Sequence, residues 1–81
     1  MSIKITIKSL DGNRRELEVE SSSTIKSVKK QLEEIEGIRA DQLRLIFKGN
    51  LLHDNEVLSN KKVENGSLLH SAIMLRGGLN N

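Results

Sequence analysis

The stretch that decides the fold lies at residues 24–38 and reads TIKSVKKQLEEIEGI. Its apolar residues recur every three or four positions, a spacing that lines one face of an α-helix. Thr24 stands before the first of them, and its hydroxyl can accept from the free amides of a first helical turn. Gly37 follows the last, where a left-handed residue typically ends a helix. The sequence therefore predicts one amphipathic helix, whose apolar stripe consists of Ile25, Val28, Leu32 and Ile35.

Two neighbours of this stripe are expected to pack with it. Ile38 lies just after Gly37, and we expect it to fold back on the last turn. Lys29 lies at the edge of the stripe, so its aliphatic stem is expected to be buried.

Before the helix, apolar and polar residues alternate over 3–8 and again over 16–20, the period of strands with one buried face. Asp11-Gly12 between them tolerates the positive φ of a turn. This segment predicts a hairpin, in which we expect Lys4 and Lys8 to face glutamates of the second strand.

After the helix, the alternation over 43–48 predicts a third strand, with Ile46 on its wet face. Leu51-Leu52 is interpreted as a very short fourth strand. A last strand is predicted over 68–75, where two apolar sets compete for the inner face. Since one set includes His70, whose imidazole prefers water, we place the other set inside, namely Leu69, Ile73 and Leu75.

The order β-β-α-β-(β)-β predicts an α+β roll, a mixed sheet of four to five strands packed on one helix. The chain has 81 residues, enough for one small core. We expect one domain over residues 1–75 and a flexible tail over 76–81.

The composition excludes several classes of function. The chain has no Cys, which removes disulfides, thiolate metal ligands and a thiol nucleophile. Its net charge is only +2 and its aromatic content 1%, which argues against nucleic acid as a partner. No apolar run approaches a bilayer's thickness, so no membrane contact is expected. His53 and His70 lack companions at metal spacing. We therefore expect no catalytic residue, no metal, no bound cofactor and no enzyme activity.

Two features point to binding. The third and last strands expose apolar residues that Leu10, in the first turn, is expected to join, with Arg76 among the cations at the rim. This predicted patch consists of Leu10, Arg44, Ile46, Lys48, His70 and Ala72. The second feature is Gly77-Gly78, since two residues without Cβ atoms can thread a narrow groove of another protein.

Four segments resemble the ubiquitin family in order and spacing, over nearly the whole chain. The resemblance implies the β-grasp fold, places the predicted patch on the family's recognition surface and places Gly78 at its conjugated terminus. The segments are Ile25-x-x-Val28-Lys29, Glu36-Gly37-Ile38, Asp41-Gln42-x-Arg44-Leu45-Ile46-Phe47-x-Gly49 and Leu75-Arg76-Gly77-Gly78.

Departures from ubiquitin favour the Rub (Nedd-type) modifiers. The family's two most used chain-linking lysines fall on Asn50 and Asn65, whose amides cannot be acylated as an amine can. Met74 stands where ubiquitin has an arginine that activating enzymes recognise. Further features that resemble the Rub modifiers are Glu33 and Glu34, as a subfamily-specific surface, and Gly66-Ser67.

The resemblance implies a Rub-type precursor, from which a C-terminal hydrolase removes Leu79-Asn80-Asn81. Activating, conjugating and ligase enzymes would then transfer Gly78 to lysines of targets, typically cullins. The hydrolase and the activating enzyme are expected to recognise Met74, Leu75, Arg76, Gly77 and Gly78. A divergent ubiquitin and a non-conjugated ubiquitin-like interaction domain stay open as alternatives. We expect a monomer in the cytoplasm and nucleus.

Overall fold

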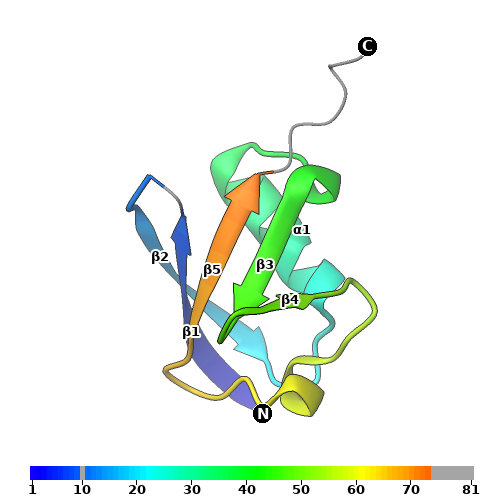
Figure 1. The fold of residues 1–81 in the computed structure, drawn as a ribbon. Coiled ribbons are helices and arrows are strands. Elements are labelled where there is room, and N and C mark those ends of the chain that lie inside the picture. The colour runs from blue at the N-terminus through cyan, green and yellow to red at the C-terminus, as the bar shows by residue number, and fades with distance from the viewer. Residues whose placement is uncertain (10, 74–81) are drawn as a thin grey trace.

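A mixed sheet of five strands packs against one helix, as the sequence predicts (Figure 1). The computed structural model of the protein describes residues 1–9 and 11–73. The strands lie in the order β2-β1-β5-β3-β4, with β1 and β5 parallel and the other neighbouring pairs antiparallel. Along the chain the elements are β1 (Ser2–Ser9), β2 (Arg14–Glu20), α1 (Ile25–Glu36), a 3₁₀ helix (Ala40–Gln42), β3 (Leu43–Phe47), β4 (Asn50–Leu52), a second 3₁₀ helix (Leu58–Lys61) and β5 (Leu68–Ile73).

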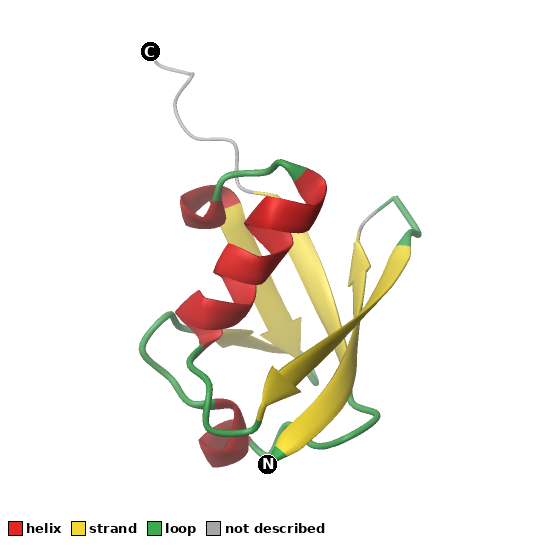
Figure 2. Cartoon of the chain, turned by 180° about the vertical axis from the view of Figure 1, so that it is seen from behind, coloured by secondary structure: helices red, strands yellow, loops and turns green. Residues whose placement is uncertain are grey.

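The core lies between α1 and the face of the sheet that the helix covers (Figure 2). Six of its side chains are wholly inaccessible to solvent, and each such burial contributes about 1.5 to 3 kcal/mol to folding. They come from three strands, the helix and the second 3₁₀ helix, so one contact surface joins these five elements. They are Ile5, Ile25, Val28, Leu45, Leu58 and Leu69.

The predicted hairpin forms, with one difference in its charge pairs. Lys4 lies opposite Glu18, as expected, but Lys8 lies opposite Arg14. The prediction for Lys8 was wrong because β2 begins with Arg14 and Arg15, so the strand register pairs Lys8 with Arg14, before the glutamates begin.

Both predicted helix caps are confirmed. The Thr24 hydroxyl accepts from the Ser27 amide at 3.3 Å. Gly37 has a φ of 75°, and its amide donates to the Glu33 carbonyl at 2.8 Å. Ile38 is half-buried against the core, as predicted.

Ile35 departs from the predicted stripe, because 44% of it is exposed whereas Ile25, Val28 and Leu32 are buried. The last turn of α1 lines an open hollow and is not covered by the sheet as the earlier turns are.

The inner face of β5 also differs from the prediction. Leu69 is buried as expected, but Ile73 is 48% exposed and the buried residue between them is Ser71. The predicted parity is right, since Leu69, Ser71 and Ile73 share a face. Ile73 pairs with Leu43, the first residue of β3, and lines the same hollow as Ile35, so it lies beyond the core. Leu75 lies outside the described residues.

Lys29 is buried more completely than its place at the edge of the stripe indicates. Only 6% of its side chain is exposed, and its ammonium lies 2.5 Å from Asp54 Oδ1. The hydrogen bond from Lys29 lowers the pKa of Asp54. The backbone beside Asp54 also serves the helix, because the Asp54 and Glu56 carbonyls accept from the amides of Lys26 and Ile25. One loop therefore accepts hydrogen bonds from the free amides of the first turn of α1 and neutralises the buried lysine of the helix.

Asp54→Asn should lower the free energy of unfolding at neutral pH by about 1 to 2 kcal/mol, because the Lys29 ammonium loses its charged partner. The cost is less than for a fully buried pair, since 56% of the Asp54 side chain is exposed. Because the folded-state pKa of Asp54 is lowered, its stabilisation is complete above the unfolded-state pKa and fades as the pH falls through the folded-state value.

Urea unfolding of both proteins, at neutral pH and in steps toward acid, measures this effect. The gap between them should shrink in acid. Glu64→Gln, at an exposed carboxylate, is the matched control and should change stability by less than about 0.5 kcal/mol. Equal stability of wild type and Asp54→Asn at neutral pH would contradict the role given to the pair.

Candidate functional site

The face of the sheet away from α1 carries the predicted patch. In the strand register Ile46 of β3 lies opposite His70 of β5, and Arg44 lies opposite Ala72. His70 also lies opposite Lys8 of β1. The structure therefore brings together Arg44, Ile46, His70 and Ala72, which the sequence placed on one surface.

The predicted patch omitted two apolar residues of this surface, one of which, Leu68, belongs to the set that the sequence analysis left on the outer face of the last strand. Leu51 lies opposite Ile46 and is 45% exposed, and Leu68 lies opposite Thr6 and is 40% exposed. The signal for Leu51 was available, because a two-residue turn after Phe47 fixes the register of the short strand that follows. From here on, the sheet-face patch means Arg44, Ile46, Leu51, Leu68, His70 and Ala72.

Lys48 follows Phe47, the last residue of β3, in the turn that leads to β4. Lys48 and Gly49 have φ values of 52° and 82°, the backbone of a two-residue hairpin turn with two left-handed positions. The Lys48 ammonium is 5.3 Å from the centroid of the Phe47 ring. Lys48, Leu68 and His70 also line a shallow hollow of about 460 Å³. Lys48 is thus adjacent to the sheet-face patch, as predicted for its rim.

Basic side chains flank the sheet-face patch on two sides. Arg44 is half-buried and donates from Nη1 to the Leu43 carbonyl at 3.3 Å. Lys8 lies on the neighbouring strand β1, opposite His70. An apolar centre with a cationic rim suits a protein surface that is apolar in the middle and acidic around it, since such an interface desolvates the apolar area and pairs the charges.

Other predicted site residues are not part of this surface. Glu33 and Glu34 lie on α1, on the opposite side of the sheet (Figures 1 and 2). Glu33 is half-buried and Glu34 is exposed. Leu10 and the tail residues Met74, Leu75, Arg76, Gly77 and Gly78 lie outside the described residues.

Among residues 1–9 and 11–73, no group of three or more His, Asp or Glu side chains is placed to hold a metal ion. Over the same residues, no helix has the length and apolar character needed to cross a bilayer.

Comparison with known proteins identifies the family of this fold and surface. Residues 5–76 match the Ubiquitin family. The matched range covers most of the hairpin, the whole helix and the strands β3, β4 and β5. The chain belongs to the ubiquitin family, and the β-grasp fold that the resemblance implied is confirmed.

Several relatives match almost from end to end. The chain is 40% identical to Ubiquitin-like protein NEDD8 of Dictyostelium discoideum over 93% of its own length and 97% of the relative's. It is 36% identical to Ubiquitin-like protein 1 of Schizosaccharomyces pombe, over 91% and 95% of the two chains. It is 35% identical to NEDD8-like protein RUB1 of Saccharomyces cerevisiae, over 91% and 96%.

Ile46→Ala should leave the free energy of unfolding within about 1 kcal/mol of wild type, because Ile46 is half-exposed on the outer face of β3. Leu45→Ala, one residue away and wholly buried, should cost about 2 to 5 kcal/mol. Ile46→Ala should also weaken binding of a protein partner on the sheet-face patch by about 1 to 3 kcal/mol, if Ile46 is a central contact.

Urea unfolding measures the first two values, and calorimetric titration of a partner measures the third. A loss of stability in Ile46→Ala as large as in Leu45→Ala would show that the strand register is wrong.

Proposed function

We propose that this protein is the precursor of a Rub-type (NEDD8-like) modifier, processed after Gly78 and conjugated through Gly78 to lysines of target proteins such as cullins. The observation that carries the proposal is the sequence Leu75-Arg76-Gly77-Gly78, two residues after a strand of the sheet-face patch. The nearly full-length similarity to relatives named NEDD8 or NEDD8-like supports it.

In this proposal the chain supplies a carboxylate, and its partners supply the catalytic groups. A hydrolase adds water across the Gly78–Leu79 peptide bond and releases Leu79-Asn80-Asn81. The freed carboxylate attacks ATP on the activating enzyme, gives an acyl adenylate and releases pyrophosphate. An enzyme thiol displaces AMP, and after transfer to the conjugating enzyme a target lysine displaces the thiol to form an isopeptide bond. The chain itself is then neither an enzyme nor a holder of a cofactor, since the activating enzyme consumes MgATP.

The proposal divides the chain into two working parts. Residues 1–75 present the sheet-face patch to the activating, conjugating and ligase enzymes, and the tail over 76–81 carries the reacting group. Met74, Leu75 and Arg76 lead into Gly77-Gly78, whose missing side chains let the tail enter an enzyme's groove. We further propose that the protein acts as a monomer in the cytoplasm and the nucleus.

Two alternatives are less well supported. A divergent ubiquitin would also conjugate through Gly78, but Asn50 and Asn65 stand where the resemblance places the main chain-linking lysines. A non-conjugated interaction domain would leave Gly77-Gly78 without a role.

Removal of Leu79-Asn80-Asn81 should be required for activation, because Gly78 has no free carboxylate while it is bonded to Leu79. Residues 1–78 should form a thioester with a Rub activating enzyme and MgATP, and the full chain should form none until a C-terminal hydrolase has acted. Non-reducing electrophoresis detects the thioester, and added dithiothreitol should abolish it.

A thioester on the untrimmed chain would refute the precursor assignment. No thioester on residues 1–78, with either a Rub or a ubiquitin activating enzyme, would refute conjugation altogether and favour the interaction domain.

Met74→Arg should separate a Rub modifier from a divergent ubiquitin. The new guanidinium adds a fixed charge beside the tail, which an acidic groove accepts and an apolar groove rejects. In residues 1–78 the substitution should raise the thioester rate with a ubiquitin activating enzyme and lower it with a Rub activating enzyme. Met74→Leu, which keeps the residue apolar and of similar size, is the matched control. Equal rates for all three proteins with both enzymes would remove Met74 as a determinant of enzyme choice.

A further inference from the structure

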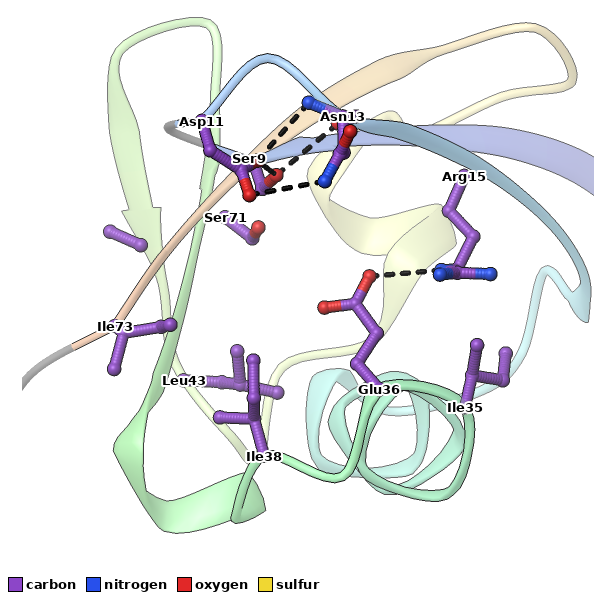
Figure 3. A pocket seen from close by; sticks show the side chains of 11 residues that line it. Ser9, Asp11, Asn13, Arg15, Ile35, Glu36, Ile38, Leu43, Ser71 and Ile73 are labelled. Carbon is purple, nitrogen blue, oxygen red and sulfur yellow. Dashed lines mark hydrogen bonds and ion pairs between the residues drawn. The ribbon is translucent and has the colours of Figure 1, made fainter.

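The loop that precedes β5 is joined to the first half of β1 by a pair of hydrogen bonds (Figure 1). The Lys4 amide donates to Asn65 Oδ1 at 2.8 Å, and the Lys4 carbonyl accepts from the Gly66 amide at 2.7 Å. One residue of β1 therefore binds both a side chain and the backbone of the loop. This junction lies at the opposite end of β1 and β5 from the hollow beside the end of α1 (Figure 3), which Ser9 and Ile73 line.

A turn over residues 64–67 sets the conformation of this loop. The Ser67 amide donates to the Glu64 carbonyl at 2.9 Å, and the Glu64 amide donates to Ser67 Oγ at 2.8 Å. Gly66 is the third residue of the turn and has a φ of 88°, which a residue with a Cβ adopts only with strain. The turn therefore requires a glycine directly after Asn65, and the pair Asn-Gly occurs nowhere else in the chain.

An asparagine that is followed by glycine can deamidate without an enzyme. The backbone nitrogen of the glycine attacks Cγ of the asparagine, loses its proton and expels the side-chain nitrogen as ammonia, which leaves a five-membered succinimide. Water then opens the ring. Cleavage between the ring nitrogen and Cγ gives aspartate, and cleavage between the ring nitrogen and the backbone carbonyl gives isoaspartate, whose main chain runs through Cγ. Glycine favours the attack because no Cβ obstructs the approach of its nitrogen.

The folded loop opposes this reaction at both reacting groups. The Lys4 carbonyl holds the Gly66 N–H and the Lys4 amide holds Asn65 Oδ1, so the nitrogen cannot turn toward Cγ until both bonds break. Asn65 and Gly66 are exposed, so breaking these bonds costs few apolar contacts. We therefore expect this segment to open locally at a free energy below that of global unfolding.

We propose that Asn65 is a site of spontaneous deamidation, whose rate is set by opening of the 64–67 turn away from β1. The reactants are this chain and water, so the reaction does not depend on conjugation through Gly78.

The two products differ in their effect on the sheet. Aspartate keeps an oxygen in the place of Asn65 Oδ1, so the Lys4 amide keeps an acceptor. Isoaspartate lengthens the main chain by one carbon shortly before Ser67, whose carbonyl accepts from the Thr6 amide at 2.9 Å. That product therefore loosens the start of the pairing between β1 and β5 and displaces Leu68 of the sheet-face patch, which lies opposite Thr6.

The test follows the full-length protein in mildly alkaline buffer. Mass spectrometry of its tryptic fragments measures the deamidated fraction at each asparagine, since replacement of NH₂ by OH adds about 1 Da. The reference is the capped peptide acetyl-Val-Glu-Asn-Gly-Ser-Leu-amide, the sequence of residues 63–68. Asn65 should react about ten- to a hundredfold more slowly in the folded protein than in the peptide. In concentrated urea the protein should react as fast as the peptide.

Ser67→Ala loosens the turn without changing the reacting atoms. It removes the oxygen that accepts from the Glu64 amide, so deamidation of the folded protein should be about two- to tenfold faster. In concentrated urea its rate should equal that of wild type, which separates the opening of the turn from the chemistry. Ser59→Ala, at an exposed serine of the second 3₁₀ helix, is the matched control and should react as wild type does.

The effect on the sheet is measured on the isolated products, which anion exchange separates from unreacted protein by their added negative charge. Hydrogen exchange at the Thr6 amide should be at least about tenfold faster in the isoaspartate product than in wild type. Asn65→Asp reproduces the aspartate product and should change this rate by less than about threefold.

Four results would overturn the proposal. They are no product at Asn65 after many half-lives of the peptide reaction, equal rates in the folded protein and the peptide, equal rates for folded Ser67→Ala and wild type, and as much product at Asn60, which a lysine follows, as at Asn65. Unchanged hydrogen exchange at the Thr6 amide in the isoaspartate product would overturn the effect assigned to the sheet.

Discussion

The contact between the apolar stripe of α1 and the sheet is the interaction on which the rest of the structure depends. The helix has three lysines in its first half and three glutamates in its second, which oppose its dipole at both ends. Isolated, such a helix of 12 residues would be marginal. Burial of Ile25, Val28 and Leu32 stabilises the helix. Two ion pairs offset its unfavourable charges: Lys29 with Asp54 near the start, and Glu36 with Arg15 at the end.

The position of α1 also determines which side of the sheet is available to partners. In each strand alternate residues face the helix, so the remaining residues form a continuous outer surface without any further constraint. One row of outward-facing residues crosses four strands, namely Lys8, His70, Ile46 and Leu51. The residues align because burial of their inward-facing neighbours fixes the strand register. A protein-binding surface on this fold is therefore a by-product of the core, and its chemistry is set by residues that contribute little to stability.

The sequence predicted those parts of the fold that depend on local chemistry, and it failed where the answer depends on where the sheet ends. Thr24 and Gly37 could be recognised because a cap is formed by neighbours in the chain. Ile35 and Ile73 have the right periodicity for burial, but they lie past the region where helix and sheet overlap. Ser71 was passed over within an apolar set, although it occupies a buried inner position of β5. The roles of the tail residues rest on resemblance alone.

The parallel pairing of β1 with β5 has a consequence for how the protein acquires its structure. The central strand β5 is the last of the five along the chain and pairs with the first, β1, so β5 joins the β1–β2 hairpin to β3 and β4. The ribosome therefore makes β5 after the other four strands, and a nascent chain lacking β5 has two separate sheet fragments with unpaired edges. Such long-range closure slows folding, because loop entropy must be lost before the central contacts form. We expect folding of the sheet to wait for β5, with both fragments exposed to chaperones until that strand has left the ribosome.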